Sequence, residues 1–243
     1  MNSKLSLKLK KRKGKIIYLC VIELLLLALI IYYLFVAKDN VNAIRVTITL
    51  LLAMVPVVLE ILFDMWIPWP MYCFLVIYAT EHTMGSCFNL YLYLPWWDDM
   101  MHCTGGFMFA TFGYYYLSIE DEITLKKRIR NIFYAISLAV FIGVLWEIVE
   151  YLVDTLFMFD MQKDVLVTRI NSYLLTSNNG ELQSIDNIKE VIVDGQVLPG
   201  YIDIGLNDTM ADMITTLTGA VVLSLYCLID REKHPLLKFE KNS

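Results

Sequence analysis

Acidic residues and histidines recur within the hydrophobic stretches of this chain, where they form three clusters. The clusters are Asp98-Asp99-x-x-His102, Glu147-x-x-Glu150-x-x-x-Asp154 and Asp208-x-x-x-Asp212. An ionisable side chain inside a bilayer costs roughly 2.5 to 3.5 kcal/mol on insertion scales, so such residues usually mark a functional site. Spacings of three and four residues place the members of a cluster on one face of a helix. The sequence therefore predicts a polar site inside a membrane helix bundle.

The residue types in these clusters suit a divalent metal ion. Carboxylates combined with one or two imidazoles are ligands for Zn²⁺, Mn²⁺ or Fe²⁺, whereas an all-oxygen subset suits Mg²⁺ or Ca²⁺. Helical bundles build such sites from ligands at i, i+3 and i, i+4 on facing helices. A cation would also keep several neighbouring carboxylates ionised, because without it some of them would hold protons. With Glu147 as general base, the predicted metal ligands are His82, Asp99, His102, Glu150, Asp208 and Asp212.

Two choices in this set depend on helical geometry. Glu81 and His82 are adjacent, and adjacent positions on a helix point about 100° apart, so only one is expected to face the site. His82 is preferred because Gly85 lies near its face. Asp99, three residues before His102, is expected to be the acidic partner of that histidine.

A purely structural interpretation remains open for some of these residues. The acids could share protons in a hydrogen-bonded network that holds the helices together, although such contacts contribute only about 0.6 to 2 kcal/mol each. Asp98 and Asp208 also lie near expected helix N-termini, where an acid can act as a cap and meet water.

The composition is typical of an integral membrane protein. Of the 243 residues, 58% are hydrophobic and 19% are charged, and the mean hydropathy is +0.56. Soluble domains carry about 25% charged residues, and the long apolar runs here match the roughly 20 residues that span a bilayer. The five cysteines show no CxxC spacing, which argues against a zinc ribbon or a disulfide framework. The sequence predicts an all-α polytopic membrane protein.

Six spans are expected to form a bundle over residues 16–228, between a basic N-terminus (1–15) and a tail (229–243). The spans are Ile16–Val36, Ala43–Phe63, Met71–Leu94, Met100–Leu117, Ile132–Phe157 and Asp208–Leu228. The polar stretch 158–207 is long for a membrane loop. Within it, Asp194-Gly195 separates two β-prone runs, which is typical of a β-hairpin with a type I′ turn. We expect a small external cap here, which either covers the site or is an elaborated connection.

The distribution of lysine and arginine predicts the orientation. With both termini cytoplasmic, 15 of the 20 basic residues lie on the inner side, among them the run Lys126-Lys127-Arg128. All three acidic clusters then fall in the outer-leaflet half of the bundle. Because the basic runs flank membrane spans, they indicate contact with lipid headgroups and not nucleic-acid binding.

Four sequence motifs carry the polar residues. They are Glu81-His82-x-x-Gly85, Trp97-Asp98-Asp99-x-x-His102, Trp146-Glu147-x-x-Glu150 and Asp208-Thr209-x-x-Asp212. From about Met71 to Leu228 this pattern resembles the YjdF-like family of uncharacterised bacterial inner-membrane proteins. The resemblance implies a multi-pass protein of the bacterial cytoplasmic (plasma) membrane, without implying an activity. The polar positions of the family correspond here to His82, Asp98, His102, Glu147, Glu150, Asp208 and Asp212.

Three functions are compatible with the sequence. The first is a metal-dependent hydrolase or transferase that acts at the outer leaflet on a lipid-linked substrate. The second is a proton- or cation-coupled transporter, although no inverted repeat is visible. The third is a membrane scaffold or sensor whose cap binds a partner. The expected partners are membrane lipids and the lipid-linked substrate, and homo-oligomerisation is left open.

Overall fold

The computed structural model describes residues 12–63, 65–117, 124–175 and 180–229. The chain is predominantly helical and forms two compact units, Met1–Ile142 with Thr215–Ser243, and Gly143–Ile214. Most of the predicted basic N-terminus, and the tail from residue 230 onward, lie outside the described residues. The helical content confirms the predicted all-α class, and the small β region lies between residues 165 and 203.

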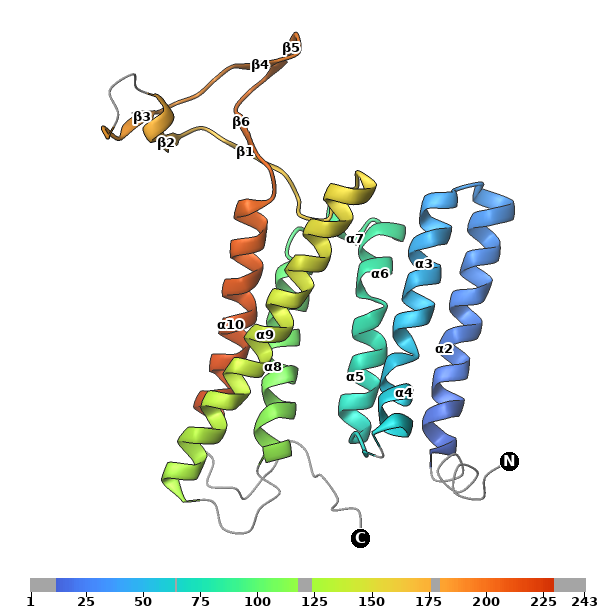
Figure 1. Cartoon of the computed structure of the whole chain (residues 1–243). Coiled ribbons are helices and arrows are strands. Elements are labelled where there is room, and N and C mark those ends of the chain that lie inside the picture. Colours follow the sequence, from blue (N-terminus) through green and yellow to red (C-terminus); the bar gives the residue numbers. More distant parts are fainter. Residues whose placement is uncertain (1–11, 64, 118–123, 176–179, 230–243) are drawn as a thin grey trace. The chain divides into compact units, whose positions relative to one another are not determined.

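Among the described residues, seven α-helices of the first unit precede residue 118, and two longer helices follow. The seven are α2 (Lys13–Tyr32), α3 (Asn40–Ala53), α4 (Val55–Leu62), α5 (Trp69–Ala79), α6 (Glu81–Cys87), α7 (Leu90–Tyr93) and α8 (Trp97–Leu117). Helices α9 (Leu125–Phe157) and α10 (Leu206–Ile229) each belong partly to the first unit and partly to the second. In the first unit α2 packs along α3, and α5 lies between α3 and α8 (Figure 1).

Four of the described helices are long and apolar enough to cross a membrane. They are Lys13–Ala37 (α2 with the π-helical turn that extends it), Asn40–Leu62 (α3 with α4), Leu125–Phe157 and Leu206–Ile229. The other two predicted spans, Met71–Leu94 and Met100–Leu117, fall on segments that are not among these four. The first of these segments is interrupted, and the helix that contains the second carries two acids in its first turn.

Two of the predicted spans are broken near their middles. Helix α3 stops at Ala53, and α4 resumes at Val55 with Pro56 in its first turn, where a missing N–H costs no hydrogen bond. Helix α5 stops before Thr80, whose N–H bonds to the Ile77 carbonyl at 2.8 Å in a tighter turn. Interrupted helices of this kind leave backbone groups available for local contacts.

A buried ion cluster ties the start of α2 to the end of α4. Glu60 is fully buried and accepts a hydrogen bond from Arg12 Nε at 3.0 Å and another from Lys15 Nζ. Lys15 also donates to the backbone carbonyl of Ile67, and its ammonium lies 3.7 Å from the centre of the Trp66 ring. Because each charge meets an opposite charge or a carbonyl, the cluster is a satisfied structural anchor.

Helix α8 packs closely against the second half of α10 within the first unit. A Cβ atom at Gly106 would collide with the Thr216 carbonyl, and one at Gly219 would collide with the Cys103 carbonyl. Small residues at such positions allow two helix backbones to approach each other. The adjoining core is built from Ala110 and Tyr114 of α8, Ala135 and Ala139 of α9, and Ala220, Leu223 and Cys227 of α10.

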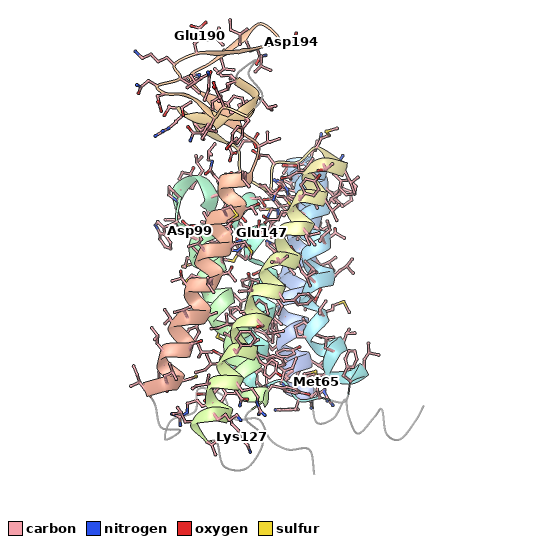
Figure 2. All side chains as sticks on the ribbon, turned by 60° about the vertical axis from the view of Figure 1, so that its left-hand side comes forward. Met65, Asp99, Lys127, Glu147, Glu190 and Asp194 are labelled. Carbon is pink, nitrogen blue, oxygen red and sulfur yellow. The ribbon has the colours of Figure 1, made fainter. Side chains whose placement is uncertain are left out.

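The second unit contains a cap of three short antiparallel strand pairs. The pairs are β1 (Val165–Val167) with β6 (Tyr201–Asp203), β2 (Ile170–Ser172) with β3 (Gln183–Ile185), and β4 (Val191–Val193) with β5 (Gln196–Leu198). Between β4 and β5, Asp194 (φ 47°) and Gly195 (φ 82°) are both left-handed, as a type I′ turn requires. This confirms the predicted hairpin. Glu190 and Asp194 lie at the end of the cap that is far from Glu147 (Figure 2).

Hydrogen bonds join the two helical segments of the second unit at the base of the cap. The carboxylate of Asp154, near the end of α9, accepts from the backbone N–H groups of Met161 (2.7 Å) and Gln162 (2.8 Å). The Gln162 amide in turn donates to the hydroxyl of Thr209 on α10 at 2.5 Å. These contacts fix how the chain leaves one helix and enters the other.

Candidate functional site

Three buried carboxylates converge in the second unit. Glu147 and Glu150 lie three residues apart on α9, and Asp212 is on α10. Their exposed fractions are 6%, 6% and 2%. One carboxylate oxygen from each lies within 4.8 Å of the others, and we refer to the group as the carboxylate triad. The i, i+3 spacing explains why both glutamates are on the same face of α9.

The size of the triad fits a single divalent cation. Two oxygens on opposite sides of a cation with bonds of 2.0 to 2.6 Å are about 4 to 5 Å apart, which is compatible with oxygens that all lie within 4.8 Å of one another. Three carboxylates so close together repel one another if all are ionised in a medium of low dielectric constant. A cation removes this repulsion, and an all-oxygen donor set favours Mg²⁺, Ca²⁺ or Mn²⁺.

Trp146 orients one member of the triad. Its indole Nε1 donates a hydrogen bond to Glu150 Oε1 at 2.8 Å. A partner that fixes one oxygen of a ligating carboxylate restricts the rotation of that carboxylate about its side chain. The sequence did not predict this contact, because an aromatic residue beside an acid carries no signal of a hydrogen bond.

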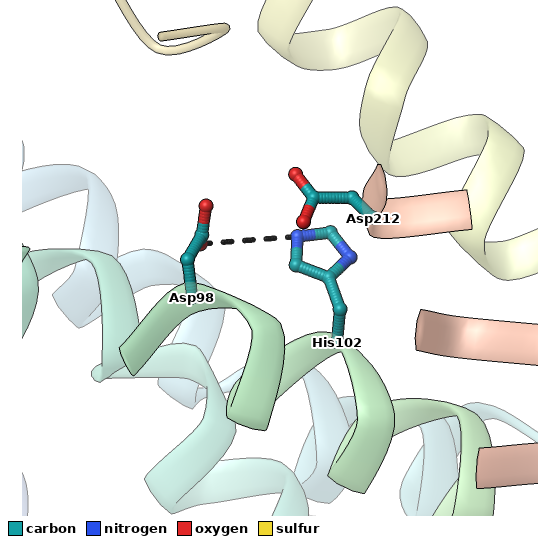
Figure 3. A group of neighbouring side chains, drawn as sticks. All are labelled: Asp98, His102 and Asp212. Atoms are coloured by element: carbon teal, nitrogen blue, oxygen red, sulfur yellow. Dashed lines mark ion pairs between the residues drawn. The ribbon is translucent and has the colours of Figure 1, made fainter. Parts of the chain in front are cut away.

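A second polar group surrounds His102 in the first unit. The His102 side chain is 5% exposed, and its Nε2 lies 3.9 Å from Asp98 Oδ1, as the dashed line in Figure 3 shows. Its Nδ1 lies 3.4 Å from the hydroxyl of Thr216 on α10. The acid beside His102 is thus Asp98, one full helical turn away, and Asp99 is exposed (Figure 2). The sequence had predicted Asp99, the other of the two adjacent aspartates, as the partner of His102.

Helix α10 carries residues of both polar groups. Asp212 of the triad and Thr216, which contacts His102, are four residues apart on this one continuous helix. Residues at i and i+4 lie on the same face of a helix. Asp212 and Thr216 therefore lie on one face of α10.

The structure places two other predicted ligands among different partners. Asp208 accepts a hydrogen bond from the Lys163 backbone N–H at 3.1 Å, and its carboxylate lies 3.7 Å from the Lys163 ammonium. His82 lies beside Tyr91, which also bonds to Glu81. The sequence had preferred His82 to Glu81 for the site, whereas the structure engages both side chains with Tyr91.

A further set of acids lies at the base of the cap, beside the end of α9; of these, Asp160, Asp164 and Asp203 lie outside the candidate membrane-spanning helices. The pKa of Asp164 is raised above its usual value, first by burial and then by the charges of Asp160, Asp154 and Asp203. The backbone N–H of Asp164 is held by Asp160 Oδ1 at 3.3 Å. Asp164 therefore holds its proton more tightly than a free aspartate does.

Comparison with known proteins gives one family. The family described as "Predicted membrane protein (DUF2238)" matches residues 18–233, which include both polar groups. No curated protein and no solved structure matches the chain. The YjdF-like pattern of motifs fits this family, so the resemblance inferred from the motifs is confirmed. The chain is a member of the DUF2238 family of membrane proteins.

Proposed function

We propose that the protein is a membrane-embedded, metal-dependent hydrolase or transferase for a lipid-linked substrate. The observation that carries the proposal is the carboxylate triad, on two helices apolar enough to cross a membrane. Each acid buried in a bilayer costs about 2.5 to 3.5 kcal/mol, and interhelical hydrogen bonds return only about 0.6 to 2 kcal/mol each. A structural network alone would not offset this cost, whereas a divalent cation would.

The members of the triad are given different roles. Glu150 and Asp212 hold the cation, and Trp146 keeps the Glu150 carboxylate oriented. Glu147 is the general base that accepts a proton from the attacking water or hydroxyl group. A bound divalent cation supplies charge neutralisation and lowers the pKa of a coordinated water. Mg²⁺ and Mn²⁺ fit the oxygen ligands best.

His102 is not assigned to the ligand set of the triad, because it belongs to the first unit, where it is buried beside Asp98 and Thr216. Asp99, His82 and Asp208 are left out of the proposed ligand set, because the first is exposed and the other two lie against Tyr91 and Lys163.

The surroundings of the triad suit a substrate with a lipid tail. On α9 the residues next to the two glutamates are apolar and exposed, among them Leu145, Ile148 and Val149. In a membrane these side chains meet acyl chains, so a lipid-linked molecule can approach the triad without leaving the bilayer.

We further propose that the protein lies in the bacterial plasma membrane with both termini in the cytoplasm. Within the first unit, Lys127 lies at the same end as Met65, and Asp99 lies at the opposite end (Figure 2). The basic run at Lys127 marks the cytoplasmic side by the usual bias of lysine and arginine. The end that carries Asp99 is then external.

One observation favours a second candidate function, a cation-coupled transporter. The α3–α4 and α5–α6 segments are interrupted near their middles. Discontinuous helices are frequent in carriers, where the broken ends bind substrate or coupling ions. The buried carboxylates would then bind a transported cation or relay protons.

The first experiment measures metal content by mass spectrometry on protein purified in detergent without chelators. The wild type is compared with Glu150→Gln/Asp212→Asn, and Glu190→Gln, an exposed acid of the cap in the same unit, serves as the control. We expect about one metal per chain in the wild type and the control, and none in the double variant. A folded wild-type protein without metal would overturn the proposal.

A second pair of assays separates the enzyme from the carrier. Release of the headgroup from lipid-linked phosphate esters or glycosides in detergent, lost in Glu147→Gln with metal retained, supports the enzyme. Cation-dependent flux in proteoliposomes, without any turnover of these substrates, supports the carrier instead.

A further inference from the structure

A third polar group lies in the first unit, apart from the carboxylate triad. The hydroxyl of Tyr91 on α7 donates a hydrogen bond to Glu81 Oε1 on α6 at 2.9 Å. The same hydroxyl oxygen lies 3.4 Å from Nδ1 of His82. Glu81 is 8% exposed, and His82 is half-buried. One tyrosine hydroxyl thus stands between a buried carboxylate and a more accessible imidazole.

The backbone between α6 and α7 is shaped to bring Tyr91 there. Asn89 adopts a left-handed conformation (φ 57°), which reverses the chain so that α7 folds back on α6. The Tyr91 ring then lies over Gly85, where a Cβ atom would collide with it. Asparagine tolerates the left-handed region, and glycine leaves room for the ring. Both residues thereby position the hydroxyl.

Counting protons determines the direction of each hydrogen bond. A tyrosine hydroxyl has one proton, which it donates to Glu81. Its oxygen can still accept, so the proton between Tyr91 and His82 must come from the imidazole Nδ1. The resulting chain runs from His82 Nδ1–H to the Tyr91 hydroxyl and on to the Glu81 carboxylate. While Glu81 is ionised, this order requires that neutral His82 carries its proton on Nδ1.

We propose that Glu81, Tyr91 and His82 form a proton relay that loads a buried carboxylate from an accessible imidazole. The imidazolium of His82 gives its Nδ1 proton to the Tyr91 oxygen while the tyrosine gives its own proton to Glu81. The products are a neutral imidazole that keeps its proton on Nε2, an intact tyrosine hydroxyl and a protonated carboxylic acid. One positive and one negative charge disappear together, so the transfer leaves the net charge of the group unchanged.

The helices packed against α6 bring other ionisable groups towards this region. Arg45 is the charged residue of α3, and Asp98, Asp99 and His102 belong to α8. The link from α3 itself is neutral, because Thr49 and Thr83 join the two helices through their hydroxyls at 2.5 Å. The relay therefore has its own donor, bridge and acceptor on α6 and α7.

The tautomer of His82 tests the geometry directly. The chain contains three histidines, so nitrogen NMR of histidine-labelled protein is assigned with His82→Asn. At alkaline pH, before a proton has been passed to Glu81, we expect neutral His82 to carry its proton on Nδ1 in the wild type, and on Nε2 in Tyr91→Phe and in Gly85→Ala, which displaces the ring. Tyr93→Phe, an exposed tyrosine on the same short helix, should leave the signal unchanged. A wild-type His82 protonated on Nε2 at alkaline pH would overturn the proposal.

Infrared difference spectroscopy tests the transfer itself. Acidification across the range in which imidazoles titrate, about pH 8 to 5, should produce a protonated carboxylic acid band. This band should be absent in Glu81→Gln, which keeps the acceptor oxygen, and should be lost or delayed in Tyr91→Phe. A band that persists unchanged in both folded variants would assign the proton to another acid and refute the relay. Neither readout requires metal at the triad, so the two proposals fail separately.

Discussion

The indole of Trp146 donates a hydrogen bond to the carboxylate of Glu150, one helical turn later on α9, at 2.8 Å. An i, i+4 pair on a helix is held in place by the backbone itself. The indole therefore acts as a fixed donor that selects one orientation of the carboxylate.

Replacing Trp146 should weaken metal binding without removing a ligand. Trp146→Phe keeps the ring volume but loses the N–H, so Glu150 rotates more freely in the unbound protein. Loss of such a supporting hydrogen bond typically costs about 10- to 100-fold in metal affinity. Calorimetric titration with Mn²⁺ measures the change. Trp96→Phe, at an exposed position, is the matched control and should bind as the wild type does.

Divalent cations should raise the melting temperature of the wild-type protein. Binding to the folded state alone contributes about 2.7 kcal/mol when the free metal is about 100 times the dissociation constant. Asp212→Asn removes one charge of the triad and should abolish this stabilisation. The variant should also melt higher than the wild type in the presence of chelator, because fewer like charges remain. An equal metal response in both proteins would count against the triad as the binding site.

Close packing between α8 and α10 should make Gly219 intolerant of any side chain. In Gly219→Ala the new methyl group meets the Cys103 backbone carbonyl, which cannot move aside as a flexible side chain would. Overpacking of this kind costs about 1 to 3 kcal/mol. Thermal unfolding in detergent measures the loss. Thr104→Ala, at an exposed position of α8, should change the melting temperature little. A Gly219→Ala protein as stable as the wild type would show that the two helices are farther apart.

Asp164 should make the cap more stable in acid than at neutral pH. Its pKa is raised in the folded protein, by burial first and then by neighbouring carboxylates, so the folded state binds this proton more tightly than the unfolded chain. The favourable contribution is complete below the unfolded pKa, near 3.8, and disappears as the pH rises through the folded value.

Asp164→Asn should remove this dependence. At neutral pH the amides of β1 and β6 should exchange slightly more slowly in the variant than in the wild type. This difference in exchange rate should vanish in acid. Glu190→Gln provides the control for loss of a negative charge on the cap. Slower exchange in the wild type than in Asp164→Asn at neutral pH would contradict the assigned direction.

Local signals in the sequence were sufficient to predict several features of the structure. Apolar runs predicted the helices, because each run is long enough to bury its backbone polar groups within one element. Asp194-Gly195 predicted the hairpin, since both residues tolerate the positive φ that its turn requires. The i, i+3 spacing of Glu147 and Glu150 predicted a shared face, and the motifs predicted the family.

The interruptions of the helices were not visible in the same signals. Hydropathy averages over many residues, so it predicted a continuous span through Thr80, where the structure shows a break. Proline can occupy the interior or the first turn of a membrane helix, and the sequence alone does not say which.

Contacts between elements were decided by the tertiary structure. Asp98 and Asp99 are equally acidic in the sequence, and the rotation of α8 about its axis decides which of them meets His102. The link from Tyr91 to Glu81 and His82 depends on a chain reversal at Asn89 and on the empty space at Gly85. Periodicity determines which residues share a face, but the rotation and close approach of each helix depend on its packing with distant segments. For this reason the sequence by itself determined which residues could do chemistry, and the fold decided which of them meet.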